Sequence, residues 1–308
     1  MAARNQTITL TEEDEKFYLS SCKTVYDGNY TDCIFNGDAY EIMEQLPDNS
    51  VDLIIADPPY NLSKRYAERS FHKMKRQHYK DLAETFMKSA KRVLRPNGSI
   101  YICCDWHDSV DVSEALDNHF SIKTRITWQR EKGRGCSANW KNCMEDIWFA
   151  VSNPKDYVFN LDAVKQRRSV IAPYKADGKP KDWVETEIGR FRDTCPSNFW
   201  DDISIPYWSM PENTEHPTQK PEKLAAKLIL ASSNPGGVVL DPFLGSGTTA
   251  VTAKKLGRHF IGIELQARYS AIAAKRVELA ETDKSIQGYA DGVFWERNTA
   301  MIQSRYRK

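Results

Sequence analysis

The sequence lacks the long apolar segments that mark membrane proteins. Its 308 residues contain no uninterrupted apolar run close to the roughly 20 residues that a membrane-spanning helix needs. The first residues, MAARNQ, lead into acidic positions without the apolar core of a secretory signal peptide. These absences predict a cytoplasmic protein that has no membrane partner.

The cysteines lack the spacing of a metal or redox site. There are seven, an odd number, and no pair shows the C-x-x-C arrangement of a zinc or redox motif. Cys103 and Cys104 lie in an apolar run, where buried thiols are usual. We therefore expect reduced cysteines and no bound metal, with a single nucleophilic thiol as the lesser alternative.

Neither sign of charge predominates over the whole chain. Lys and Arg number 43 and Asp and Glu number 42, a formal net charge of +1, which argues against a strongly basic nucleic-acid coat protein. This average conceals one basic stretch, because residues 63–95 hold eleven Lys and Arg but only three acids, a net charge of +8. What such a stretch binds depends on the motif that precedes it.

Short apolar runs alternate with amphipathic stretches over most of the chain. Strands are predicted at 33–38, 51–56, 99–104, 125–128, 147–151, 237–241 and 259–264, and helices at 39–46, 78–94, 223–232 and 248–255. This alternation predicts an α/β fold with a mostly parallel sheet and helices on both faces. Residues 153–215 are weakly periodic and richer in Pro, Trp and charge, which indicates an inserted segment.

A glycine turn follows the strand predicted at 237–241. The sequence Asp-Pro-Phe-Leu-Gly-Ser-Gly-Thr places Gly245 and Gly247 where a tight turn brings the backbone close to a ligand. It lacks the full G-x-G-x-x-G spacing of a dinucleotide site and the lysine of a P-loop. Glu264, at the end of the next strand, suits the two hydroxyls of a ribose. The motif favours an adenosine-bearing cofactor; the alternative is that the glycines serve only the turn.

A second corner, Asp57-Pro58-Pro59-Tyr60, follows the strand predicted at 51–56. Ligands of open α/β sheets bind at this edge, and prolines hold the backbone rigid while removing its donors. Asp57 and the Pro58 carbonyl are placed to accept two hydrogen bonds from one exocyclic amine, and Tyr60 to stack on the ring that carries it. Such a pocket suits a flipped nucleobase; the alternative is an ordinary proline turn.

The two corners together resemble the β-group of DNA amino-methyltransferases, in which the catalytic motif precedes the cofactor motif. A third motif, His-Pro-Thr-Gln-Lys-Pro at 216–221, stands just upstream of the glycine turn. The resemblance covers roughly residues 32–108 and 198–280. It implies a Rossmann-like methyltransferase fold. It also implies an enzyme that transfers a methyl group from S-adenosylmethionine to an amino nitrogen of a flipped-out base in double-stranded DNA. Because the first motif position is Asp rather than Ser, the resemblance favours adenine N6 over cytosine N4.

The resemblance also implies roles for individual residues. The catalytic residues it implies are Asp57, Pro58, Pro59 and Tyr60. The cofactor-binding residues it implies are Asp38, Ala39, His216, Pro217, Thr218, Gln219, Lys220, Asp241, Pro242, Phe243, Gly245, Ser246, Gly247, Thr248, Thr249 and Glu264. Among these, Asp38 is expected near the adenine, Glu264 at the ribose, and the glycine turn around the methionine part.

The basic stretch directly follows the proposed base pocket, where a phosphate backbone should pass. The residues predicted to contact DNA are Lys64, Arg65, Arg69, Lys73, Lys75, Arg76, Gln129 and Arg130. For the helical part of this stretch the alternative is a solvated helix face.

The resemblance divides the chain into a catalytic half at 32–152, a target-recognition segment at 153–215 and a cofactor-binding half at 216–280. Terminal extensions at 1–31 and 281–308 flank them. The expected activity is that of a site-specific adenine-N6 DNA methyltransferase, in a restriction–modification system or as an orphan regulator. The alternatives are a cytosine-N4 enzyme and a nucleic-acid-binding protein with an inactive methyltransferase fold. A homodimer and a cognate restriction endonuclease are partners that the family allows.

Overall fold

The computed structural model describes residues 7–25, 27–61, 64–66, 69–71, 74–130, 137–170, 175–207, 210–297 and 299. Its centre is an eight-stranded sheet with the order β1-β15-β14-β2-β5-β7-β6-β13. The strands are β1 (Cys33–Asn36), β2 (Val51–Ala56), β5 (Leu94–Cys104), β6 (Ser121–Gln129), β7 (Met144–Val151), β13 (Phe199–Trp200), β14 (Val238–Asp241) and β15 (His259–Glu264). Neighbours in this sheet are parallel except where β7 pairs with β5 and β6.

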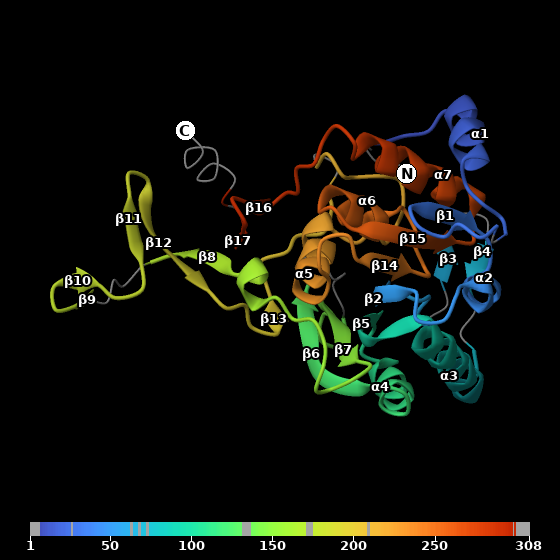
Figure 1. Ribbon diagram of the computed structural model, residues 1–308, viewed down its shortest axis with the longest axis horizontal. Helices are drawn as coiled ribbons and strands as arrows, with labels where there is room; N and C mark the ends of the chain where they lie inside the picture. Colours follow the sequence, from blue (N-terminus) through green and yellow to red (C-terminus); the bar gives the residue numbers. More distant parts are fainter. Residues whose placement is uncertain are drawn as a thin grey trace.

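Helices cover both faces of the central sheet (Figure 1). They are α2 (Ala39–Gln45), α3 (Arg76–Val93), α4 (Ser109–Asp117), α5 (Glu222–Ser232), α6 (Thr248–Lys255) and α7 (Ala267–Leu279), whereas α1 (Glu12–Ser20) packs on α7. Alternation along β2 shows how the core is divided, because Ile54 packs with residues of α2, α3 and α4, whereas Leu53 and Ile55 pack with residues of α5, α6 and α7. The predicted α/β fold is confirmed.

The two motif corners meet because β2 and β14 are parallel neighbours. Leu53 pairs with Val239 and Ile54 with Leu240, so both strands end at the same edge. From β14 the sheet continues through β15 to β1, and from β2 it continues through β5 in the other direction. This is the topological switch point, where open α/β sheets bind their ligands.

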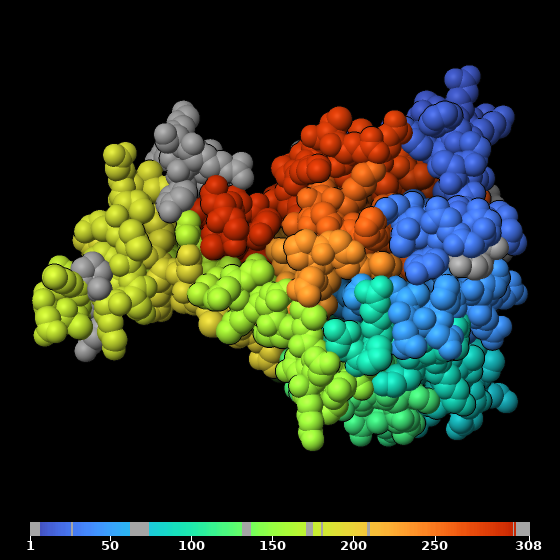
Figure 2. Space-filling model, viewed as in Figure 1, coloured from blue at the N-terminus to red at the C-terminus, as the bar shows by residue number. Residues whose placement is uncertain are grey.

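A second, five-stranded sheet projects beyond the β13 edge of the central sheet (Figures 1 and 2). It comprises β11 (Val184–Thr186), β12 (Gly189–Thr194), β8 (Gln166–Ser169), β17 (Val293–Trp295) and β16 (Tyr289–Ala290), in that order. The remaining elements are the 3₁₀ helix η1 (Leu161–Val164) and two hairpins, β3 (Lys64–Tyr66) with β4 (Arg69–Phe71) and β9 (Lys175–Ala176) with β10 (Lys179–Pro180).

Strands outside the predicted catalytic and cofactor-binding halves pair with distant parts of the chain. Residues 281–308 are expected as a terminal extension, but β17 pairs in parallel with β8 of the segment 153–215, and Trp295 packs edge-on against Phe191. That segment also lends β13 to the central sheet. The described part of the lead-in 1–31 contains α1, whose capping box of Thr11 and Asp14 is a signal that the periodicity analysis missed.

None of the helices in the described ranges combines the length and apolar character that crossing a membrane requires.

The glycine turn is held by α7 from behind. At Gly247, φ is +88°, and a Cβ there would lie 2.7 Å from the Cβ of Ala273, so glycine is required for helix packing. Arg276 of α7 is buried; it donates to the Ser246 carbonyl at 2.7 Å and to the Glu222 carboxylate at 3.0 Å. One guanidinium thus fixes the turn to α5 and α7.

Replacing Arg276 by Met should lower the free energy of unfolding by about 2–3 kcal/mol, because the buried Ser246 carbonyl loses its donor, whereas Glu222 keeps an ion pair with Lys255. Arg190→Met is the matched control, since Arg190 pairs with Glu185 at the surface and such pairs contribute about 1 kcal/mol or less. Urea unfolding of both variants measures the difference. Equal losses would show that Arg276 does not hold the turn.

Candidate active site

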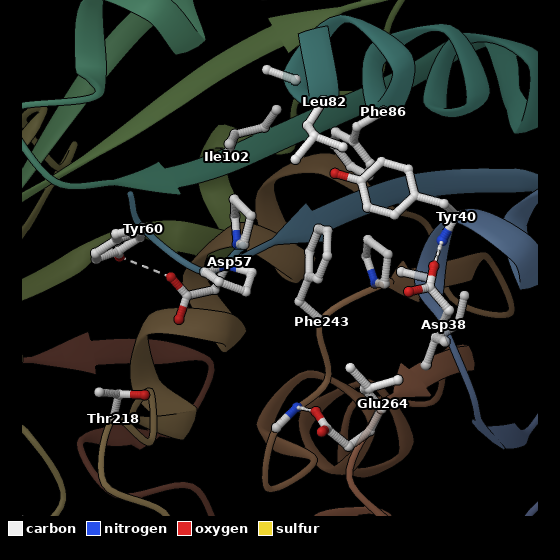
Figure 3. A pocket seen from close by; sticks show the side chains of 18 of the residues that line it. Asp38, Tyr40, Asp57, Tyr60, Leu82, Phe86, Ile102, Thr218, Phe243 and Glu264 are labelled. Carbon is white, nitrogen blue, oxygen red and sulfur yellow. Dashed lines mark hydrogen bonds between the residues drawn. The ribbon is translucent and has the colours of Figure 1, made fainter. Parts of the chain in front are cut away.

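A cavity of about 330 Å³ opens at the switch point. Its size lies at the lower end of the range of about 300–1,000 Å³ for small-molecule sites. Fourteen of the predicted site residues line it: Asp38, Ala39, Asp57, Pro58, Pro59, Tyr60, Arg130, His216, Thr218, Lys220, Pro242, Phe243, Gly245 and Glu264. Figure 3 shows Asp57 and Tyr60 on one side, Asp38, Tyr40 and Glu264 on the other, and the Phe243 ring between them.

The other predicted cofactor residues do not line this cavity. They are Pro217, Gln219, Asp241, Ser246, Gly247, Thr248 and Thr249. Two of them hold the segment that carries Lys220. The Gln219 side chain accepts from the Thr214 hydroxyl at 2.7 Å, and the Thr248 hydroxyl donates to the Lys220 carbonyl at 2.8 Å. Asp241 accepts from the Phe243 amide at 3.0 Å, and burial raises the pKa of Asp241 to about 7.

Glu264 is fixed by backbone donors on both sides. Its Oε2 accepts from the Gly245 amide at 2.8 Å and its Oε1 from the Gln266 amide at 2.7 Å. Burial raises the pKa of the Glu264 carboxyl, although these hydrogen bonds oppose the shift. A carboxylate held in this way is preorganised to accept hydroxyl groups of a ligand in the cavity.

Much of the remaining lining is apolar and was not expected from the motifs. The missed residues that line the cavity are Gly37, Tyr40, Met74, Tyr79, Leu82, Ala83, Phe86, Met87, Ile102, Val112, Glu145, Ile263, Leu265, Gln266 and Tyr269. Asp38 caps α2 by accepting from the Tyr40 amide at 2.8 Å, and the Phe86 and Phe243 rings lie 5.5 Å apart. The helical spacing of Leu82 and Phe86 in α3 is the available signal, because it shows that this helix turns an apolar face inward.

At the Asp57 corner, both carboxylate oxygens have partners. Oδ1 accepts from the Tyr60 hydroxyl at 2.8 Å, and Oδ2 accepts from Lys220 Nζ at 2.5 Å. Burial raises the pKa of Tyr60 well above its ordinary value, and the Asp57 charge adds to this. For Lys220, burial alone would lower the pKa, but the Asp57 and Glu145 carboxylates outweigh it and raise the pKa. Lys220 therefore stays charged and acts on Asp57.

His216 and Gly245 form a close contact beside Glu264. At Gly245, φ is +54°, and a Cβ there would lie 3.1 Å from His216 Nε2. Burial lowers the pKa of His216 to about 4, so the ring is neutral. Its Nδ1 is buried and has no hydrogen-bond partner among the described residues. A buried polar atom of this kind is suited to a bound molecule.

The residues predicted to contact DNA have different surroundings. Lys73 lies outside the described residues, as do the side chains of Lys64, Arg65 and Arg69, whose backbones form the β3–β4 hairpin. Lys75 is exposed just before α3, and Gln129 ends β6. Arg76 binds Asp111 through two nitrogens, and Arg130 binds Glu145 at 2.7 Å. Contact of these residues with DNA stays a prediction.

Part of the net positive charge of residues 63–95 is neutralised by acidic residues elsewhere in the fold. Besides Arg76, three cations of this stretch whose side chains the structure describes form ion pairs, namely Lys80 with Glu114, Arg92 with Asp48 and Arg95 with Asp52. These cations help to hold α3 and β5 against their neighbours. Their charge is therefore less available to a phosphate backbone than the sequence sum suggests.

Comparison with known proteins identifies the family to which the chain belongs. A family model described as DNA methylase matches residues 51–275. The chain belongs to this family. It is 34% identical over 268 residues to the DNA adenine methyltransferase YhdJ of Escherichia coli K12, covering 85% of this chain and 87% of the relative. It is 33% identical over 246 residues to the type II methyltransferase M.HpaI of Haemophilus parainfluenzae, covering 78% and 72%.

A solved structure, the complex of M1.HpyAVI with S-adenosylmethionine, has a TM-score of 0.54 to this chain and 28% sequence identity. It covers 79% of this chain and 98% of the other. The resemblance drawn from the motifs is thereby confirmed: the protein is an S-adenosylmethionine-dependent DNA methyltransferase of the N6/N4 class. The cavity fits this cofactor, because it combines the anchored Glu264 carboxylate, aromatic walls and the unpartnered His216 nitrogen.

Glu264→Gln should weaken binding of S-adenosylmethionine about 10- to 100-fold, since a hydrogen bond to a charged group contributes about 1.5–3 kcal/mol. The amide also presents an NH₂ group to one of the two backbone donors that now hold the carboxylate. Calorimetric titration measures the affinity, and Glu41→Gln on the exposed side of α2 is the control. Unchanged affinity in the Glu264 variant would remove this carboxylate from the cofactor site.

Proposed function

We propose that the protein methylates the N6 amine of adenine in duplex DNA, with the target base flipped out into the cavity beside Asp57. The observation that carries this proposal is the Asp57 carboxylate at the carboxyl end of β2, next to the glycine turn. Two facts support adenine: Asp stands at the first position of the motif, and a relative with 34% identity is named an adenine methyltransferase.

The corner 57–60 would hold and activate the amine. Its two N–H groups would donate to Asp57 and to the Pro58 carbonyl, which favours a more tetrahedral nitrogen with an available lone pair. The prolines keep these acceptors rigid, and the Tyr60 ring would stack on the base. S-adenosylmethionine supplies an electrophilic methyl group on a sulfonium. In-line placement of the two reactants contributes up to about 7–11 kcal/mol in favourable cases.

Several partners follow from the same proposal. The family is described as DNA methylase, which supports DNA as the substrate, and a relative with 33% identity is named a type II methyltransferase, which supports a place in a restriction–modification system with a cognate endonuclease. We also propose a homodimer and a cytoplasmic location. The prediction that Lys75, Gln129 and Arg130 contact the DNA belongs to this proposal.

The decisive experiment combines purified protein, labelled S-adenosylmethionine and unmethylated genomic DNA, followed by nucleoside analysis of the product. We expect label in N6-methyladenine. Label in N4-methylcytosine would favour the alternative target base. An absence of label in DNA would favour a nucleic-acid-binding protein with an inactive methyltransferase fold.

Asp57→Ala should leave the affinity for S-adenosylmethionine within about threefold and lower the rate of methyl transfer at least about 100-fold, as expected when a group that stabilises the developing charge is removed. Radiolabel incorporation and calorimetry measure the two effects. Asp117→Ala, an exposed carboxylate on α4, serves as the control. Turnover retained by the Asp57 variant would reject the assigned role.

A further inference from the structure

Glu145 is a buried carboxylate that the sequence motifs do not single out. It lies on β7, two strands away from Asp57 in the sheet, and its side chain is 4% exposed. Oε1 binds Arg130 Nη1 at 2.7 Å. Oε2 has no hydrogen-bond partner among the described residues and lies 3.3 Å from Lys220 Nζ. An unpaired carboxylate oxygen is costly to bury unless a cation stands close to it.

Lys220 therefore lies between two carboxylates. It binds Asp57 Oδ2 at 2.5 Å and lies 3.3 Å from Glu145 Oε2. Moving the ammonium from one carboxylate toward the other needs only a small change in a long, flexible side chain and no shift of the backbone.

The position of this ammonium matters for the chemistry. Methylation of a neutral amine builds positive charge on its nitrogen, so a negative Asp57 stabilises the transition state and a lysine bound to Asp57 opposes it. In the structure Asp57 also accepts from the Tyr60 hydroxyl, so both of its oxygens are engaged before a base arrives. Release of the Lys220 ammonium would leave Asp57 with its full negative charge for the incoming amine.

The charges of the cluster support such a release. Asp57, Glu145, Lys220 and Arg130 together are neutral when all four are ionised. Without Arg130 the remaining three carry one negative charge, which suits a developing cation. The Arg130 side chain is 30% exposed, so it can reach a phosphate, whereas Glu145 cannot leave.

We propose that Glu145 is a positioning residue that draws Lys220 off Asp57 when DNA binds, so that Asp57 accepts the amine of the target base. In the absence of DNA, Arg130 binds Glu145. When DNA binds, a phosphate replaces Glu145 as the partner of Arg130, and Glu145 then binds Lys220. This inference rests on the proposed role of Asp57.

The test uses Glu145→Gln, Lys220→Met and the double variant in the full-length protein. Single-turnover methyl transfer is measured at saturating S-adenosylmethionine with unmethylated genomic DNA. Glu145→Gln should slow methyl transfer at least 30-fold, while calorimetry shows cofactor affinity within threefold of the parent. Adding Lys220→Met to Glu145→Gln should restore the rate at least fivefold, because the cation that neutralises Asp57 is gone.

If Glu145 and Lys220 had only structural roles, the double variant would be slower than Glu145→Gln, since removing a second buried group would slow the enzyme further. The proposal is overturned if Glu145→Gln keeps the parental rate, or if the double variant is no faster than Glu145→Gln. Asp146→Asn is the matched control, because this neighbouring carboxylate on β7 faces the opposite side of the sheet, and it should keep the parental rate. If Glu145→Gln fails to fold, Glu145→Met, which also removes the negative charge, replaces it with the same expected order.

These outcomes are separable from failure of the proposed function. If the parent protein does not methylate DNA, or if Asp57→Ala remains active, the proposed function fails whatever the Glu145 variants do. If the parent is active and Asp57→Ala is not, the rates of the Glu145 variants decide the present inference alone.

Discussion

The parallel pairing of β2 with β14 is the constraint on which the site depends. Asp57 and the glycine turn are far apart in the chain, and only this pairing places them at one edge of the sheet. The pairing also sets the switch point from which the sheet extends in both directions. Residues that do not touch the cavity, such as Arg276 and Gln219, serve the same end by bracing the loops that leave this edge.

Local patterns predict most of the central sheet and both motif corners. Strands such as β2 and β14 are nearly all apolar because both of their faces are covered, and the corners carry rare combinations of Pro, Gly and Asp. The apolar wall from α3 and the ion pairs of its cations depend on packing between distant segments. A single sequence does not show which acid a given arginine meets, so the pairs of Arg76 and Arg130 were not expected.

The site concentrates charge where burial makes it expensive. Lys220, Asp57 and Glu145 are held close together, and Asp241 lies behind them with a raised pKa. Away from the cavity, Lys227 and Lys223 share the buried carboxylate of Asp202. The second cluster satisfies its charges by direct contact, whereas at the cavity Glu145 Oε2 and His216 Nδ1 have no hydrogen-bond partners in the part of the chain that the structure describes. This contrast separates a structural cluster from one arranged for chemistry.

The pairing of β17 with β8 has a consequence for the order of folding. A ribosome completes β8, β11 and β12 before β14 and β15, yet the small sheet needs β17, which is made after all strands of the central sheet. Domains fold during synthesis as their parts emerge. The central sheet can therefore form while β8 of the five-stranded sheet still lacks β17 as its neighbour. During synthesis, the small sheet therefore cannot be completed until all strands of the central sheet have been made.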